Sequence, residues 1–350
     1  MQHAPPMPEP RAPREPLVAS GEIQPHAADM AVVASADVTL GDVQSALAEH
    51  GQWLAVDGDA SWTLRELVDH DSTGPLRLGF GGWRDLMTGC QFTTGSGDLI
   101  TAGGLPVKNV AGYDLCKLIV GSHGCFGTAQ TYTLRTYRQP EAAMSATLKV
   151  SPEHVAQTVS DQLASPAPPT WMLLTPAGLH LGWLGRGREI DKLAPIARET
   201  VGAVDPRSLD DDIADRADKL AVHRHGQSDG LFDLVRLCVP PARSAEVAGE
   251  IDWRGYAIDP VFGIAWIAPG GEAGPWPALA AARRLGGHGL RLRRLESDQI
   301  TVESEVDAPA GHIASRADDY GVNRASAEIL RRLKKQFDPD NRLPALSIGG

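Results

Sequence analysis

The sequence predicts a mixed α+β protein with more than one domain, and three observations support this. The chain has 350 residues, which exceeds one typical hydrophobic core and suits two or three domains. Short runs that alternate apolar and polar residues are interleaved with runs of helical period. A similar order of strands and helices also occurs twice after residue 141. We therefore expect antiparallel sheets covered by helices.

Composition limits the function classes that fit this chain. The formal net charge is −11 and the pI is about 5.5, so the chain has no basic surface typical of nucleic-acid binding. It contains no run of about 18 apolar residues, which argues against a membrane span. The four cysteines are widely spaced and form no CxxC pair, which predicts neither disulfides nor a metal site and favours a reduced, cytoplasmic setting.

The N-terminal segment changes character at residue 29. Residues 1–28 are dense in proline and charge and predict a disordered leader. After them MAVVAS predicts a strand and TLGDVQSALAEHG a helix, in which Thr39 and Asp42 have the spacing of a capping box. An apolar face of Val43, Ala46 and Leu47 supports the helix. A folded unit therefore begins here.

Two further strand signals complete this first unit. The stretch from residue 89 to 103 has alternating runs around GSGD, which is typical of a hairpin. Residues 128–138, TAQTYTLRTYR, alternate over a full strand that Pro140 ends. We place a domain boundary near Pro140, giving a domain over 29–140.

Residues 141–310 predict a second domain. Two copies of a βαββαβ order, from 144 and from 230, would form an antiparallel sheet covered by helices. Between the copies, residues 205–226 are rich in Asp and Arg and predict a solvated connection.

The last segment, residues 311–350, predicts an amphipathic helix and a tail. The expected apolar face consists of Ile329, Leu330, Leu333 and Phe337. The basic residues Arg331, Arg332, Lys334 and Lys335 form a solvated face near the helix C-terminus, or alternatively a docking site for an acidic partner.

A glycine-rich stretch runs from Gly103 to Gly127, with the sequence GGLPVKNVAGYDLCKLIVGSHGCFG. Glycine permits close backbone approach and positive φ, so this density predicts a cofactor-facing turn. Cys116 and Cys125 flank the turn and are either small buried hydrophobes or, alternatively, a reactive thiol.

The string VKNVAGYDLCKLIVGSHGCFG, preceded by RLGFGGWRDLMTGCQFTTGSGDLITAGG, resembles the FAD-binding domain of FAD-linked oxidases of the vanillyl-alcohol oxidase type. Within that superfamily it is most similar to FAD-binding subunits of bacterial glycolate oxidases. The resemblance is strong over about residues 30–140 and slight over most of the remainder.

The resemblance implies FAD bound between two α/β subdomains, a cap domain over the flavin ring, and oxidation of a small 2-hydroxy acid. Matched position by position, it assigns cofactor contacts to three segments and to the KN pair between them: Gly81, Arg84, Asp85 and Gly89; Lys108 and Asn109; Gly112, Tyr113 and Asp114; and Gly121, Ser122, Gly124 and Gly127.

Each of these residues also has a structural interpretation. Arg84 and Asp85 could form a salt-bridged turn, Tyr113 a packed ring and Lys108 a solvated charge. Their shared order along the chain favours an inherited flavin-domain architecture. The same order favours a role as a subunit of an FAD-dependent oxidoreductase. Whether this chain is itself an enzyme stays open.

The sequence departs from the family pattern in three places. No PxGGGT-like phosphate loop precedes residue 29, so we expect a truncated first FAD subdomain. WTLRELVDHDSTG, from Trp62 to Gly74, replaces a TIGG-like turn, and His123 stands in the glycine loop. Converging backbone donors hold pyrophosphate, so these departures predict weak binding of FAD by this chain alone.

Two hypotheses follow for the function. The chain is an FAD-binding subunit of a glycolate-oxidase-like 2-hydroxy-acid oxidoreductase, with a partner completing the site, or a degenerate flavin-domain protein that acts as a structural or assembly subunit. The expected partners are a full-length FAD oxidase subunit and an iron-sulfur subunit. No catalytic base is assigned, although His123, His223 and His225 are candidates for titration near neutral pH.

Overall fold

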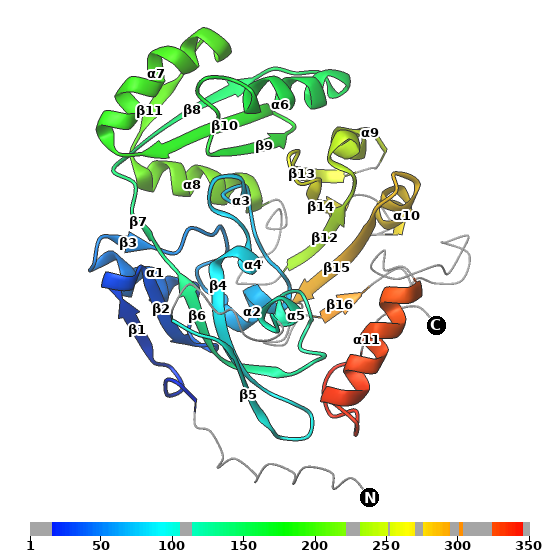
Figure 1. The fold of residues 1–350 in the computed structure, drawn as a ribbon. Coiled ribbons are helices and arrows are strands. Elements are labelled where there is room, and N and C mark those ends of the chain that lie inside the picture. Colours follow the sequence, from blue (N-terminus) through cyan, green and yellow to red (C-terminus); the bar gives the residue numbers. More distant parts are fainter. Residues whose placement is uncertain are drawn as a thin grey trace, which may run out of the picture.

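The computed structural model describes residues 16–105, 114–221, 232–250, 253–269, 276–294, 301–303 and 324–345. In this part of the chain, a five-stranded and a nine-stranded antiparallel sheet organise the hydrophobic core (Figure 1). A short pair, β3 (Gln52–Trp53) and β7 (Tyr137–Arg138), lies beside the smaller sheet. The expected α+β class with antiparallel sheets is confirmed.

The smaller sheet has the strand order β1-β2-β6-β4-β5, with every pair antiparallel. The strand expected at MAVVAS, the hairpin around GSGD and the long strand after residue 127 are all present. We call this sheet and the helices around it the N-terminal unit. Its strands are β1 (Ile23–His26), β2 (Ala31–Ser35), β4 (Met87–Thr93), β5 (Leu99–Gly103) and β6 (Thr128–Arg135).

The disordered leader predicted through residue 28 is corrected by β1. Residues 23–26 pair with β2 at the edge of the sheet, where Pro25 lies opposite Val32. Proline lacks an N–H and is tolerated on an edge strand, so a proline-rich segment can still pair there. Residues 1–15 lie outside the described part of the chain.

The helices of the N-terminal unit begin at side-chain caps. The predicted α1 (Leu40–Ala48) is confirmed, and the Thr39 hydroxyl accepts a bond from the Asp42 N–H at 3.1 Å. An unpredicted α2 (Leu64–Asp69) begins in the same way, at Thr63 and Glu66. Three single-turn helices follow, α3 (Arg77–Phe80), α4 (Trp83–Leu86) and α5 (Cys116–Ile119), and the 3-10 turn η1 (Ala27–Asp29) precedes β2.

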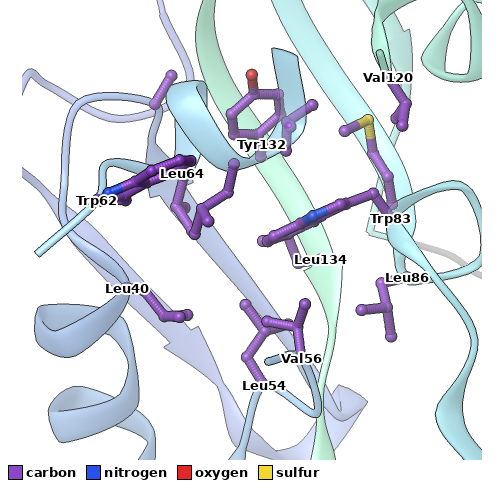
Figure 2. Packing of buried hydrophobic residues seen from close by; sticks show 14 of the residues in the cluster. Leu40, Leu54, Val56, Trp62, Leu64, Trp83, Leu86, Val120, Tyr132 and Leu134 are labelled. Carbon is purple, nitrogen blue, oxygen red and sulfur yellow. The ribbon is translucent and has the colours of Figure 1, made fainter. Parts of the chain in front are cut away.

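Large buried side chains hold α2 and α4 against the smaller sheet. Figure 2 shows the indole of Trp83 beside Leu134 of β6, with Trp62 and Leu64 next to it. Trp83 is fully buried, and its Nε1–H donates to the Ser72 carbonyl at 2.7 Å. Each such side chain contributes about 1.5 to 3 kcal/mol on burial. The chain from Trp62 to Leu86 is therefore fixed by the core.

The nine-stranded sheet has the order β11-β8-β10-β9-β13-β14-β12-β15-β16. In the first four strands of this list, the strands of one βαββαβ unit lie in the order fourth, first, third, second. The next four strands repeat this order in reverse, so the sheet consists of two such units joined side by side at β9 and β13. The repeat expected from the sequence is therefore present. Its strands are β8 (Ala142–Leu148), β9 (Trp171–Thr175), β10 (Gly178–Gly185), β11 (Asp205–Arg207), β12 (Phe232–Cys238), β13 (Trp253–Asp259), β14 (Ile264–Pro269), β15 (His288–Arg294) and β16 (Thr301–Glu303).

The two faces of this large sheet belong to two different cores. On β12, Val235 and Leu237 face one core and Leu234 faces the other, as strand alternation requires. The first core is covered by the helices of the repeats. The second is continuous with the core of the N-terminal unit. The covering helices are α6 (Val155–Leu163), α7 (Gly187–Val201), α9 (Val247–Glu250) and α10 (Trp276–Arg284), with the 3-10 turns η2 (Pro152–His154) and η4 (Pro241–Glu246).

The solvated connection predicted over residues 205–226 is wrong. Its described part, residues 205–221, holds β11 and the helix α8 (Leu209–Leu220), which lies between the N-terminal unit and the large sheet (Figure 1). Asp212 and Arg216 of α8 are almost fully buried. The high charge of the segment gave no sign that these two residues are buried and form an ion pair.

The C-terminal helix α11 (Arg324–Phe337) is present, and Leu330, Leu333 and Phe337 of its expected apolar face pack against the core. Ile329 is 59% exposed, whereas Phe337 packs against the rings of Phe92 and Phe126. Lys334, predicted to be solvated, is buried and pairs with Asp338 at 2.5 Å. Among the described residues, no helix is long and apolar enough to cross a bilayer.

Candidate functional site

The glycine loop from Gly121 to Gly127 bonds to its own protein. The Gly121 N–H donates to the Val68 carbonyl at 2.9 Å, and the His123 N–H donates to the Asp69 carbonyl at 3.0 Å. Both carbonyls belong to the last turn of α2. The Ser122 N–H donates to the Ile119 carbonyl of α5, and the Cys125 N–H donates to the Ser122 carbonyl, each at 3.1 Å. Four backbone donors in the expected cofactor-facing loop are therefore already occupied.

Acidic side chains lie beside this loop. Asp69 is half-buried, and its Oδ1 is buried without a hydrogen-bond partner among the described residues. Burial raises the pKa of Asp69 to about 7 against the opposing charge of Arg65. A Cβ built on Gly124 would lie 3.7 Å from the Asp69 Oδ2, and one on Gly121 would lie 3.4 Å from the Asp71 Cβ. Carboxyl groups therefore border the loop on the side of α2.

Two histidines join the loop to α2. The Nδ1 atoms of His70 and His123 are 2.8 Å apart, and their rings are tilted toward each other. Burial lowers the pKa of His123 to about 4, and the charge of Arg236 acts in the same direction. The expectation that His123 titrates near neutral pH is therefore wrong. His223 and His225 lie outside the described residues.

Residues 81–89 form a second part of the expected cofactor surface. Asp85 accepts a bond from the Gly82 N–H at 2.9 Å and caps α4. Arg84 is exposed and donates to the Val120 carbonyl at 3.4 Å, which links this segment to the glycine loop. A Cβ on Gly81 would come within 2.6 Å of Asp85. This segment is thus a packed turn that adjoins the loop.

Close packing explains other glycines of the expected surface. A Cβ on Gly127 would lie 2.4 Å from the Phe92 ring, and one on Gly89 would lie 2.7 Å from the Gly104 nitrogen. Asp114 is exposed and pairs with Lys117 at 3.1 Å. Four assigned residues lie outside the described part of the chain: Lys108, Asn109, Gly112 and Tyr113.

The cysteines are buried rather than presented to a cofactor. Cys116 lies 3.8 Å from Cys90, sulfur to sulfur, and Cys125 is 3% exposed. Burial raises the pKa of the Cys125 thiol to about 12, which keeps it protonated. The interpretation of Cys116 and Cys125 as small buried residues is confirmed.

A cavity of about 450 Å³ lies between the N-terminal unit and the large sheet. The sheet contributes Leu234, Arg236 and Trp266, while α1 and residues 52–62 form the opposite wall. α8 closes one side. The cavity is mostly apolar, and its size is within the range of small-molecule sites.

A buried ion cluster supports one wall of this cavity. The Arg216 Nε donates to the Asp57 Oδ1 at 2.8 Å, and its Nη1 pairs with Asp212 one helical turn earlier. All three side chains are at most 7% exposed. Charges removed from water are tolerated only when paired in this way. The cluster therefore joins α8 to the N-terminal unit.

Sequence reasoning did not find this cavity or its polar residues. One signal was present: Arg236 interrupts the apolar strand LFDLVRLCV, at a position where alternation places it on the same face as Leu234. The partners Asp57 and Arg216 are 159 positions apart, which no local pattern reveals.

Comparison with known proteins gives relatives for part of the chain. No protein-family profile matches it. It is 30% identical over 145 residues to the glycolate oxidase subunit GlcE of Escherichia coli, covering 40% of this chain and 41% of that protein. It is 36% identical over 104 residues to the glycolate oxidase subunit GlcD of Bacillus subtilis, covering 29% and 22%. A probable mitochondrial D-lactate dehydrogenase of Danio rerio is 31% identical over 35% of this chain and 25% of its own length.

Solved structures match nearly the whole chain. 6-Hydroxy-D-nicotine oxidase from Arthrobacter nicotinovorans has a TM-score of 0.57 and 18% identity over 92% of this chain and 78% of its own. Alkyldihydroxyacetonephosphate synthase has a TM-score of 0.58 and 12% identity, covering 90% and 64%. The chain has the fold of the FAD-linked oxidases of the vanillyl-alcohol oxidase type. The chain spans about two fifths or less of the length of GlcE, GlcD and the D-lactate dehydrogenase named above.

FAD is the cofactor that this fold family implies, and the described loop does not fit its pyrophosphate. Phosphate binding needs backbone N–H groups that point at the ligand and a favourable local charge. Here the Gly121 and His123 donors are bound to α2, and Asp69 adds a carboxyl group beside them. The Gly121 and His123 N–H groups are therefore not available to an anion in this structure.

Proposed function

We propose that this chain is a subunit of a FAD-linked 2-hydroxy-acid oxidoreductase complex, in which it has an assembly role and does not bind FAD tightly on its own. The likeness to GlcE and GlcD over part of the chain supports a place in a glycolate-oxidase-like complex. A full-length FAD oxidase subunit and an iron-sulfur subunit are the proposed partners.

The occupied glycine loop carries the proposal. Binding a pyrophosphate there would require breaking the bonds from Gly121 and His123 to α2 and moving Asp69 away. A charged hydrogen bond contributes about 1.5 to 3 kcal/mol, so two lost donors correspond to roughly two to four decades of affinity. A site formed by this chain alone would therefore bind FAD weakly.

A second candidate is an FAD-binding subunit completed by a partner chain. The cavity between the N-terminal unit and the large sheet favours it, because the family resemblance expects the flavin ring between the FAD domain and the cap. In this case the partner would supply the donors for the phosphates.

The test is flavin content of the chain purified alone and co-expressed with an FAD oxidase subunit and an iron-sulfur subunit. We expect the lone chain to be colourless, to release no FAD on denaturation, and to co-purify with the other subunits. Stoichiometric FAD on the lone chain would contradict the proposal. FAD per complex that exceeds the content of the oxidase subunit would favour the second candidate.

A deletion control separates the assembly role from flavin binding. Omitting this chain should prevent the other subunits from co-purifying, although the oxidase subunit should keep its own flavin. An intact complex without this chain would contradict the assembly role.

A further inference from the structure

Two cysteines that are distant in the sequence meet in the core of the N-terminal unit. Cys90 lies in the middle of β4, and Cys116 is the first residue of α5, 26 positions later. Their sulfur atoms are 3.8 Å apart, and the two residues are 2% and 5% exposed. The contact depends on the packing of α5 on β4, so the spacing of the cysteines along the sequence does not predict it.

The smaller sheet determines where the Cys90 sulfur lies. Cys90 is paired directly opposite Ala102 of β5 on one side and Tyr132 of β6 on the other. Side chains that lie opposite each other in neighbouring strands project from the same face of a sheet. All three belong to one hydrophobic core, together with Cys116 and Ile119 of α5. α5 therefore covers the face of the sheet from which the Cys90 sulfur projects.

Weak hydrogen bonds give the two thiols different roles. The Cys90 thiol donates to the Cys116 sulfur, and the Cys116 sulfur lies 3.8 Å from the Ala102 carbonyl oxygen. The bond from Cys90 lowers the pKa of Cys116, against burial and the charge of Asp114, and the same bond raises the pKa of Cys90. The thiolate is the nucleophilic form of cysteine. Cys116 is therefore the thiol that reacts first, and Cys90 is placed to react with its product.

The distance between the sulfurs is small enough for a covalent bond to form. The sulfurs of a disulfide are about 2.0 Å apart, so the two atoms must approach by roughly 1.8 Å from the 3.8 Å of this structure. Rotation of χ1 from one staggered position to the next moves a cysteine sulfur farther than this. The bond can thus form by side-chain rotation while β4 keeps its pairing with β5 and β6.

We propose that Cys90 and Cys116 are a redox modification site, at which hydrogen peroxide converts the two thiols into a reversible disulfide. This site goes beyond the proposed assembly role and does not depend on whether FAD is bound.

The reaction has two steps. The Cys116 sulfur attacks one peroxide oxygen and becomes a sulfenic acid, while the other oxygen leaves as hydroxide and takes up the Cys116 proton to give water. The Cys90 sulfur then attacks the sulfenic sulfur, and the displaced hydroxide leaves with the Cys90 proton as a second water. The two thiols lose two electrons in total, and one hydrogen peroxide is reduced to two water molecules.

The disulfide would close a covalent loop across 26 positions of the chain, which include β5. Closing a loop restricts the unfolded chain more than the folded one. The oxidised protein should therefore unfold at a higher urea concentration than the reduced protein, and a dithiol reductant should reverse the shift.

Peptide mapping of the full chain tests the proposal. The purified chain is treated with hydrogen peroxide, its remaining thiols are blocked, and it is digested without reductant. We expect one cross-linked peptide pair that joins Cys90 to Cys116, about 2 Da lighter than the two reduced peptides together and absent after reduction with dithiothreitol. The proposal is overturned if both thiols remain reduced when the half-buried Cys238 is already oxidised, or if either is joined to Cys125 or Cys238 instead.

Substitutions at the two positions separate their roles. Cys90→Ser keeps a hydroxyl that can donate to Cys116 but removes the second sulfur, so the Cys116 sulfenic acid should accumulate. Dimedone, which reacts with sulfenic acids, should label Cys116 at least about 10-fold more in this variant than in the wild type. In Cys116→Ser, labelling of Cys90 should stay low, because Cys90 is not the thiol that reacts with peroxide. Equal labelling of Cys116 in Cys90→Ser and in the wild type would overturn the proposal.

Cys125→Ala is the matched control. Cys125 is also buried in the N-terminal unit, and burial raises the pKa of its thiol to about 12. Its removal should leave the yield of the disulfide between Cys90 and Cys116 unchanged, and loss of that disulfide would overturn the proposal. Because the peptide map uses the unsubstituted chain, it decides the proposal even where a variant does not fold.

Discussion

The glycine loop and the cavity differ in the space that they leave for a ligand. In the loop, the N–H groups of Gly121 and His123 are bound to carbonyls of α2, and a buried carboxyl group lies beside them. In the cavity, the Arg236 side chain donates to the carbonyls of His70 and Asp71, and a volume of about 450 Å³ stays open beside it. The loop that carries the family motif is thus packed against α2, while the open cavity carries no recognisable motif.

This difference shows that a family motif and the capacity to bind a ligand are separate properties. A position needs glycine wherever the backbone or a ring lies too close to it for a Cβ, whether or not a ligand is present, as Gly127 against Phe92 illustrates. Binding capacity needs open space lined by groups that a ligand can reach, and such space comes from the packing of distant segments.

The largest expected effect comes from the ion cluster beside the cavity. Arg216→Met leaves Asp57 and Asp212 buried without a cation, so the free energy of unfolding should fall by about 3 to 5 kcal/mol. Urea denaturation measures this. The control is Arg332→Ala, which breaks an exposed pair with Glu328 and should cost at most about 1 kcal/mol. A similar small loss for both variants would show that α8 is not held by the cluster.

A smaller effect is expected from overpacking the loop. Gly127→Ala places a Cβ within 2.4 Å of the Phe92 ring, so stability should fall by about 1 to 3 kcal/mol. Gly187→Ala is the matched control, because no atom lies within 4 Å of its Cβ position. If both variants unfold at the wild-type midpoint, close packing does not explain Gly127.

Asp69 gives a pH-dependent prediction of similar or smaller size. Folding raises its pKa from 3.8 to about 7, so the folded state binds this proton more tightly and loses stability as the pH rises between these values. Asp69→Asn removes that loss. The variant should be more stable than the wild type by about 1 to 3 kcal/mol at about pH 8 and no more stable below about pH 4.

Thermal melts of both proteins across this range provide the measurement. The stability difference between the two proteins is the relevant quantity, because other groups also change pKa on folding. Burial lowers the pKa of three histidines to about 4, namely His123, His180 and His288, and raises that of Asp259. A difference that does not change with pH would contradict the buried, protonated state of Asp69.

Local patterns in the sequence predicted much of the fold. The capping box at Thr39, the hairpin after Gly89 and the two βαββαβ units depend on neighbouring residues, and all three are present. α2 was missed because Thr63 and Glu66 were compared with a family turn rather than interpreted as a cap. β1 was missed because its proline and polar residues are typical of loops.

The candidate site was less predictable than the fold. The cavity depends on pairings such as Asp57 with Arg216 across the chain, and on Asp212 being buried although charged. Composition places such residues on the surface by default, because isolated charges are rarely buried. Only the three-dimensional arrangement reveals their partners.

Amide hydrogen exchange of the glycine loop tests the central claim most directly. If the Gly121 and His123 N–H groups are bound to α2, both amides should be protected in the purified chain, and added FAD should leave their exchange rates unchanged. Rapid exchange without FAD, followed by protection when FAD is added, would contradict this account and identify the loop as a working phosphate site.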